Sequence, residues 1–220
     1  MYLLQKIENS NHIAIKVCKD SFLLSSAVYT FLMVKHKKVT LVSGEELPLN
    51  FSFVPWYDSV RESMPTSADT VLRFDDTDVF EMYHLFKTEL GKINQKMAIA
   101  LYADLMLKYD FCRSKECNGT FFALVGELLE AGATHKICCE NLLYRESLAL
   151  VRLRSVMFKN MFLSNNATVA NIEVCEDDFN LTGASLDDAY NIAPEMLKIV
   201  NVTQVVLKKD NEVLKVFKEV

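Results

Sequence analysis

The sequence predicts an α/β protein: a parallel sheet with flanking helices, followed by a smaller α+β part. Short β-branched apolar runs alternate with a long apolar helical pattern over the first 75 residues, and helical periodicity dominates from about residue 78 to 160. Short strands around turn residues return in 161–220. Half of the 220 residues are hydrophobic, which is enough to bury a sizeable core.

The first elements predict a β-α-β unit. His12–Cys18 is short, apolar and β-branched, which is typical of an inner strand. A helix is expected over 22–34, with Asp20 or Ser21 as its N-cap. Val39–Val42 is the next strand. Two strands joined by a helix pair in parallel, so a parallel sheet is expected.

A third strand and a helical region complete the first domain. Thr70–Phe74 reads as a strand that ends at Asp75-Asp76, after an irregular stretch containing three prolines. The helical periods that follow are expected at 78–90, 94–108, 118–131 and 135–160, the last with an internal break. We place this first domain at 1–160.

The remaining residues, 161–220, predict a hairpin, a helix and closing strands. Asn165-Asn166 lies between two apolar runs, which favours a β-hairpin. Ser185 begins a capping box for a helix that runs to about Ile199. A second hairpin is expected from Val202–Leu207 and Val213–Phe217.

Composition excludes several classes of protein. The 24 basic and 29 acidic residues give a net charge of −5, which does not favour a general nucleic-acid-binding surface. No apolar run has the length of a membrane span or a secretory signal, so we expect a cytoplasmic protein with no membrane partner. The six cysteines match no common zinc spacing and are expected to be reduced thiols.

Candidate ligand-binding residues follow the three predicted strands, because ligands of open α/β sheets bind at the carboxyl ends of the strands. These ends carry Lys19-Asp20-Ser21, Ser43-Gly44 and Asp75-Asp76. Two acids at neighbouring strand ends are compatible with a divalent cation, although two alone make a weak site. The alternative is that both acids cap the helices that follow them. No phosphate-binding glycine loop or serine-nucleophile motif occurs.

The order of elements resembles the DHH phosphoesterases, in particular the bacterial group that degrades very short RNA and dephosphorylates phosphoadenosine phosphate (pAp). Ala98–Tyr102 and its continuation to Gly132 match best, and Leu128–Ala133 follows the family pattern closely. Leu142–Arg145, with its continuation to Asn160, also fits. The similarity is diffuse, covers most of the chain and includes no intact signature motif.

The resemblance implies positions for metal ligands, and this sequence retains few of them. The family His falls at Lys16, and the two family Asp after it fall at Asp20 and Phe22. The Asp that ends a later strand falls at Asp75 or Asp76, and that of a further turn falls at Lys108. The Asp-His-His segment itself is absent. Family members continue into a substrate domain with a glycine-rich loop, and this chain stops at Val220 within that domain's first strands.

The resemblance therefore implies a vestigial metal site made of Lys16, Asp20, Phe22, Asp75 and Lys108. Lysines at two ligand positions put positive charge where the metal ions would sit, so we expect no metal cofactor and no catalytic residue. The alternative cofactor is Mn²⁺ or Mg²⁺. We expect Lys16 and Lys108 to pair with Asp20 and Asp75 in a metal-free charge cluster.

Three functions remain open at this stage. The first is a non-catalytic module that binds a nucleotide, a short RNA or a protein, with Lys16, Lys108 and Arg113 as candidate phosphate-binding residues. The second is an active metal-dependent phosphoesterase acting on short oligonucleotides or pAp. The third is a structural or assembly subunit, as a homodimer or with another chain, because an uncovered edge strand invites pairing.

Overall fold

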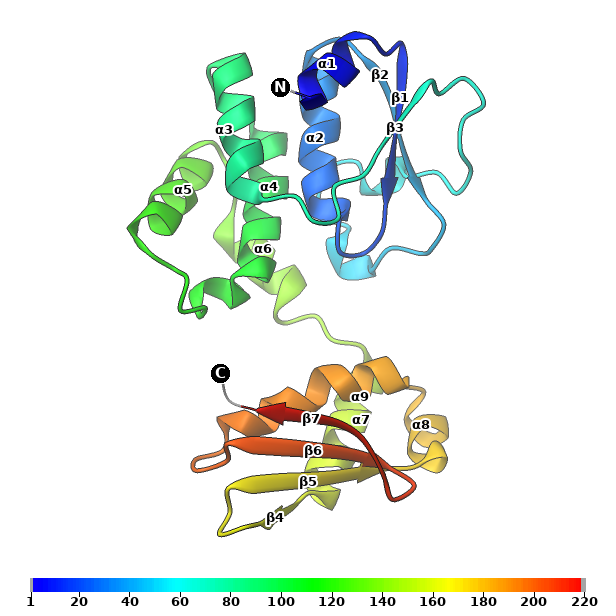
Figure 1. Cartoon of the computed structure of the whole chain (residues 1–220), viewed down its shortest axis with the longest axis vertical. Helices are drawn as coiled ribbons and strands as arrows, with labels where there is room; N and C mark the ends of the chain where they lie inside the picture. The colour runs from blue at the N-terminus through cyan, green and yellow to red at the C-terminus, as the bar shows by residue number, and fades with distance from the viewer. Residues whose placement is uncertain (1, 219–220) are drawn as a thin grey trace. The chain divides into compact units, whose positions relative to one another are not determined.

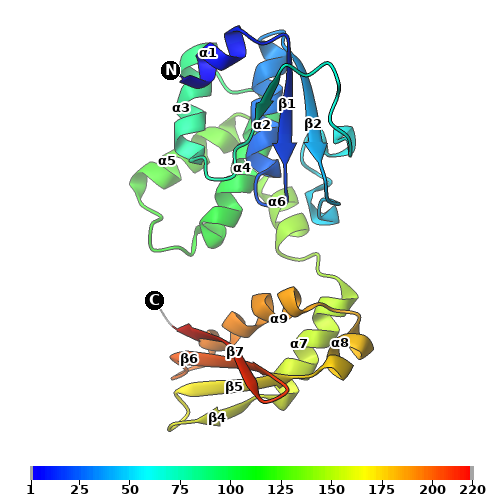
Figure 2. The same cartoon turned by 45° about the vertical axis from the view of Figure 1, so that its right-hand side comes forward.

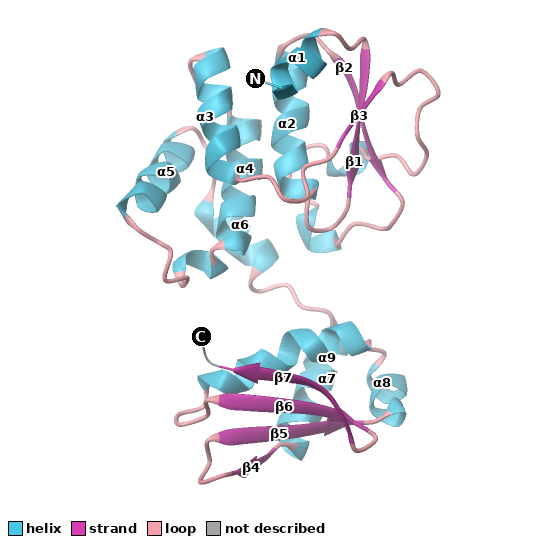
Figure 3. Ribbon diagram, in the orientation of Figure 1, coloured by secondary structure: helices cyan, strands magenta, loops and turns pink. Residues whose placement is uncertain are grey.

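The computed structural model describes residues 2–218 and consists of two compact units, Met1–Arg145 and Glu146–Val220. Figure 1 follows the chain through both units, and Figure 3 separates their helices from their strands. The α/β class predicted from the sequence is confirmed. The described residues contain no helix with the length and apolar character that crossing a membrane requires.

The first unit carries the predicted β-α-β unit and a group of helices after it. Its elements are α1 (Tyr2–Glu8), β1 (His12–Val17), α2 (Phe22–Val34), β2 (Lys38–Ser43), η1 (Leu49–Phe51), η2 (Tyr57–Ser59), β3 (Thr70–Leu72), α3 (Val79–Leu90), α4 (Gln95–Lys108), η3 (Asp110–Cys112), α5 (Gly119–Glu130) and α6 (His135–Leu142).

The sheet of the first unit has the strand order β2-β1-β3, and both pairings are parallel. Ile13 of β1 lies opposite Val39 on one side and Thr70 on the other. Because all three strands run the same way, the residues that follow them gather at one edge of the sheet. This places Asp20 and Asp75 at a common edge.

Helix α2 is apolar around its circumference because it packs against the sheet and also against α4. Figure 2 shows α2 between the strands and the later helices. Phe31 of α2 stacks on Phe86 of α3 with ring centroids 4.7 Å apart, and both rings are fully buried. Phe22, the first residue of α2, is also fully buried.

The later helices begin where their capping residues predict. Asp78, Asn94 and Asn118 cap α3, α4 and α5 through their side-chain oxygens, which accept hydrogen bonds from the first-turn amides. The break expected within 135–160 lies between Leu142 and Leu148, where α6 ends and the next helix begins.

The second unit consists of a four-stranded sheet with helices. Its elements are α7 (Leu148–Asn160), β4 (Phe162–Ser164), β5 (Val169–Val174), α8 (Glu176–Thr182), α9 (Leu186–Ile192), η4 (Ala193–Lys198), β6 (Gln204–Lys209) and β7 (Glu212–Lys218). The strand order is β4-β5-β6-β7. Both predicted hairpins are confirmed as antiparallel pairs, and the two hairpins join through the parallel pair β5–β6.

The boundary between the units differs from the one expected at residue 160. The division falls between Arg145 and Glu146, so α7 belongs to the second unit. Leu153 and Met157 of α7 are fully buried in one core with Ile172 of β5. The sequence shows the helical period of α7 but not the sheet against which its apolar side packs.

Arg154 connects the start of the second unit to its last helical turn. Its guanidinium donates to both carboxylate oxygens of Glu146 and, at 2.9 Å, to Oε1 of Glu195. We expect Arg154→Met to lower the free energy of unfolding by ~1–2 kcal/mol, because two part-buried carboxylates lose their donor. Urea denaturation measures this, with Arg152→Met, at an exposed position of the same helix, as control. Equal stability of the two variants would show that the network contributes nothing.

Candidate functional site

A pocket of about 410 Å³ lies at the carboxyl ends of β1 and β3 and is closed by residues of η1 and the end of α4. We call it the strand-end pocket. Its charged and amide side chains are those of Lys19, Asp20, Asn50, Asp75, Asp104 and Lys108. Three of the residues implied by the family resemblance, Asp20, Asp75 and Lys108, therefore line one pocket.

Neither Asp20 nor Asp75 has the capping role that the sequence left open. Helix α2 has Ser21 at its N-cap, without a capping hydrogen bond, and α3 is capped by Asp78, whose Oδ1 accepts from the amides of Phe80 and Glu81. The Cys18 thiol lies 3.7 Å from Oδ1 of Asp75 and donates to it. Both carboxylates are thus available to a ligand of the pocket.

Lys108, at the end of α4, pairs with Asp104 one turn earlier on the same helix. Its Nζ lies 2.9 Å from Oδ2 of Asp104 and also donates to the carbonyl of Thr77 at 3.2 Å. The Asp104 side chain is 3% exposed and that of Lys108 is 36% exposed. In this ion pair the carboxylate is therefore buried and the ammonium is accessible to solvent.

Sequence reasoning missed Asp104. The signal was present, because Asp104 is the only charged residue of the otherwise apolar stretch Met97–Leu107. A carboxylate inside an apolar helix is costly unless it is paired, and it therefore marks a candidate site. What the sequence did not show is that this part of α4 faces a pocket.

The other residues that the resemblance implied lie elsewhere. Phe22 is fully buried, with its ring 6.1 Å from Phe51 and 5.9 Å from Tyr57 between centroids. Lys16 is exposed on β1 and is not among the residues that line the pocket. Arg113 is exposed and donates to the side chain of Asp110 at 2.6 Å, also outside the pocket.

The pairing expected within the charge cluster is wrong. Lys108 takes Asp104 as its partner, and not Asp20 or Asp75. Over residues 2–218, no ion pair involves Lys16. The physical reason is local, since residues four apart on a helix face each other and Asp104 and Lys108 meet without any tertiary search. In the same described range, no three His, Cys, Asp or Glu side chains are grouped so that they could hold a metal ion.

Burial raises the pKa of Asp104 above its ordinary value of 3.8, although the neighbouring Lys108 ammonium lowers it and Asp78 adds a smaller upward contribution. A raised pKa in the folded state means that folding favours the protonated form. That contribution to stability is present below the unfolded-state value and is lost as the pH rises through the folded-state value.

We therefore expect Asp104→Asn to increase the free energy of unfolding at pH values above the raised folded-state pKa of Asp104, where the wild-type carboxylate is charged and buried. The gain should shrink as the pH falls toward 3.8, because the wild-type side chain then becomes neutral as well. Urea denaturation at several pH values measures the difference. A constant difference across that range would contradict this account of Asp104.

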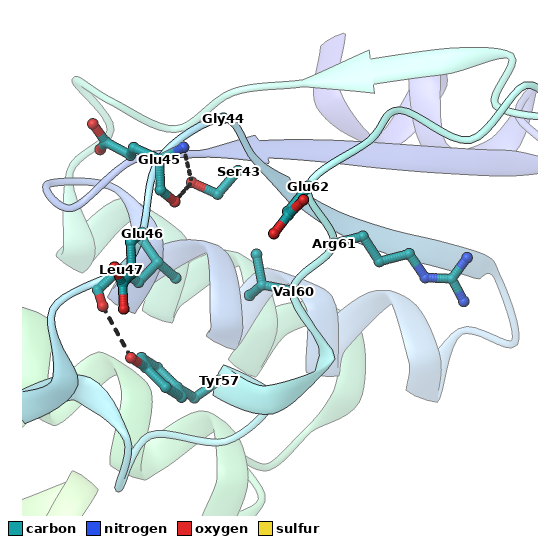
Figure 4. Close-up of a pocket in the computed structure, with 9 residues that line it drawn as sticks. All are labelled: Ser43, Gly44, Glu45, Glu46, Leu47, Tyr57, Val60, Arg61 and Glu62. Carbon is teal, nitrogen blue, oxygen red and sulfur yellow. Dashed lines mark hydrogen bonds between the residues drawn. The ribbon is translucent and has the colours of Figure 1, made fainter.

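A second pocket, of about 470 Å³, lies at the end of β2 and is shown in Figure 4. Three glutamates line it, at positions 45, 46 and 62, and the guanidinium of Arg61 extends away from the side chains of Glu45 and Glu46. Tyr57 donates its hydroxyl to the carbonyl of Leu47 at 2.9 Å. An acidic lining with its cation directed elsewhere disfavours an anionic ligand. The strand-end pocket also has acidic residues, but two lysines, Lys19 and Lys108, share its lining, so it is the better candidate.

Comparison with known proteins supports the fold. The chain is similar to the crystal structure of an exopolyphosphatase-related protein from Bacteroides fragilis, with a TM-score of 0.75 and 13% identity over 96% of this chain and 80% of that chain. A protein of Methanococcus jannaschii assigned as a family II inorganic pyrophosphatase matches with 13% identity over 94% of this chain and 69% of that one. The TM-score of that match is 0.30. No family model and no curated protein sequence matches this chain.

Proposed function

We propose that this chain is a DHH phosphoesterase-like protein that has lost metal-dependent hydrolysis and binds a nucleotide through its phosphate in the strand-end pocket. The observation that carries the proposal is the position of Lys108, whose ammonium lines the same pocket as Asp20 and Asp75. The likeness in fold to an exopolyphosphatase-related protein supports it.

The residues of the pocket do not fit a two-metal centre. The position of one expected ligand is taken by Phe22, a core side chain that has no donor atom and does not line the pocket. The position of another is taken by Lys108, whose ammonium lies 2.9 Å from the buried Asp104 carboxylate. Two divalent cations beside this ammonium would repel it.

The same ammonium suits a phosphate. Lysine is a common phosphate ligand that acts as a point charge, and Lys19 adds a second ammonium to the lining. A phosphate that approaches Lys108 meets a side chain that is 36% exposed and already held by Asp104 and Thr77. Little side-chain entropy is then lost on binding, which favours affinity.

Thermal unfolding with pAp in the presence of a chelator tests the proposal. A ligand that binds only the folded state raises the unfolding midpoint in proportion to the logarithm of its concentration, so we expect a dose-dependent rise without metal. Manganese-dependent hydrolysis of pAp or of a dinucleotide, abolished by Asp20→Ala, would contradict the proposal. That result would favour an active phosphoesterase in which the remaining aspartates hold the ion.

An assembly role is the second candidate, because the sheet of the second unit has an edge strand with exposed apolar side chains. Strand β7 lies at the end of the sheet order, with Val213 56% and Val216 41% exposed. An exposed apolar edge can pair with a strand of a second chain. Sedimentation of the wild type and of Val216→Lys tests this, and a dimer that the substitution dissociates would favour the assembly role.

A further inference from the structure

Two buried oxygen atoms without a hydrogen-bond donor line the strand-end pocket. They are Oδ2 of Asp104 and Oδ1 of Asn50. The structure describes only one other buried side-chain polar atom without a hydrogen-bond partner, Oγ of Ser25. Buried polar groups are nearly always hydrogen-bonded, so two unsatisfied acceptors in one pocket indicate that its ligand supplies donors.

The surroundings of Asp104 indicate which kind of ligand could satisfy its carboxylate. Nζ of Lys108 lies 2.9 Å from Oδ2 at an angle that is poor for a hydrogen bond, so Lys108 compensates the charge of the carboxylate but leaves acceptor capacity on its oxygens. The Asp104 side chain is 3% exposed and lines the pocket, so a further hydrogen-bond donor can reach it from the pocket. The charged groups around it are Lys108 and Asp78, together with Lys19, Asp20 and Asp75 of the pocket lining.

A fully deprotonated anion satisfies Lys108 but not Asp104. Its oxygens would turn lone pairs toward the carboxylate, and two facing acceptors repel each other. A phosphate that retains one proton presents both a charged oxygen for the ammonium and a P–OH donor for the carboxylate. Sulfate has the same shape and no proton near neutral pH.

Resting on the proposed function, we propose that Asp104 is the specificity-determining residue of the pocket and makes it select a proton-bearing phosphate over sulfate. Lys108 attracts either anion, so the discrimination comes from Asp104. The oxygen of Asn50 provides a second acceptor for a hydroxyl of the same ligand. Hydrogen bonds to charged groups contribute enough that losing one weakens binding by about tenfold or more.

The experiment compares inorganic phosphate with inorganic sulfate by calorimetry at mildly alkaline pH. Both are then dianions, hydrogen phosphate carrying one proton and sulfate none, so charge and shape are matched. We expect wild-type protein to bind phosphate about tenfold or more tightly than sulfate. Asp104→Asn should remove most of that preference by improving sulfate binding, because the amide can donate where the carboxylate could only accept.

The matched control is Asp76→Asn, an exposed acid that does not line the pocket and whose loss should leave the preference unchanged. Equal binding of both anions by the wild type would overturn the role of Asp104 while leaving the proposed function intact. Failure of pAp and both anions to bind would instead contradict the proposed function.

A measurement on the wild type covers the case in which Asp104→Asn does not fold. Phosphate monoesters lose their last proton with a pKa of about 6, so the affinity for phenyl phosphate should fall as the pH rises above that value. Phenyl sulfate has no such proton, and its affinity should not follow the phosphate titration. An affinity for phenyl phosphate that rises with pH would overturn the inference.

Discussion

Phe22→Asp, which restores the acid that the family resemblance implies at this position, is expected to unfold the first unit. The ring is fully buried and packs against Phe51 and Tyr57. Truncating a buried Phe costs about 3–5 kcal/mol, and an unpaired carboxylate in its place adds a desolvation penalty. The sum is comparable with the whole stability of an average domain, about 5–15 kcal/mol. Circular dichroism and urea denaturation measure the loss.

Phe122→Asp is the matched control, because it makes the same chemical change at a side chain that is 52% exposed on α5. Substitutions at exposed sites usually change stability by about 0.5 kcal/mol or less. A folded Phe22→Asp protein would show that this residue can leave the core and reach the pocket. The account of Phe22 as a required core side chain would then be wrong.

Lys108→Met is expected to weaken binding of pAp in a chelator by about tenfold to a hundredfold, because the phosphate loses its charged donor. The same change leaves the Asp104 carboxylate buried without its charge partner, which is destabilising. Titration calorimetry measures the affinity, and urea denaturation measures the stability. Lys92→Met, at an exposed lysine outside the pocket, should change neither.

The double variant Asp104→Asn with Lys108→Met separates these two effects. Removing the carboxylate relieves the unpaired charge, so the stability lost in Lys108→Met should return. Affinity for pAp should not return, since no ammonium has been restored at this position. Recovery of both would show that Lys108 supports the fold and does not bind the phosphate, and the proposed site would then be wrong.

The variants at Phe22 and Lys108 both test whether the pocket can hold a metal ion or a phosphate. Phe22 lies at a position where the family resemblance implies a metal ligand, and its apolar ring belongs to the core. Lys108 lies at another such position, and its ammonium lines the pocket. An apolar ring and an ammonium at positions where the resemblance implies cation ligands are the reason that a metal-free phosphate ligand is the proposed occupant.

The elements that the sequence predicted well have strong local signals. Helix α2 has the bounds expected from its apolar pattern, and both hairpins form around Asn165-Asn166 and Asp210-Asn211, whose positive φ values suit tight turns. Helices α1 and α8 were not predicted. Each has seven residues, too few for a convincing helical period.

The sequence by itself determined most of the strands and helices in their order along the chain, the parallel β1–β2 pairing and the positions of Asp20 and Asp75 after strands of the sheet, because periodicity, capping and the β-α-β rule act over short stretches of chain. Lys108 became a candidate through the family resemblance. Only the tertiary structure decided that Lys108 pairs with Asp104, that Phe22 is in the core and that α7 packs on the second sheet. Burial is the reason. Whether a charged or aromatic side chain faces a pocket, a core or water depends on elements distant in sequence that pack against it.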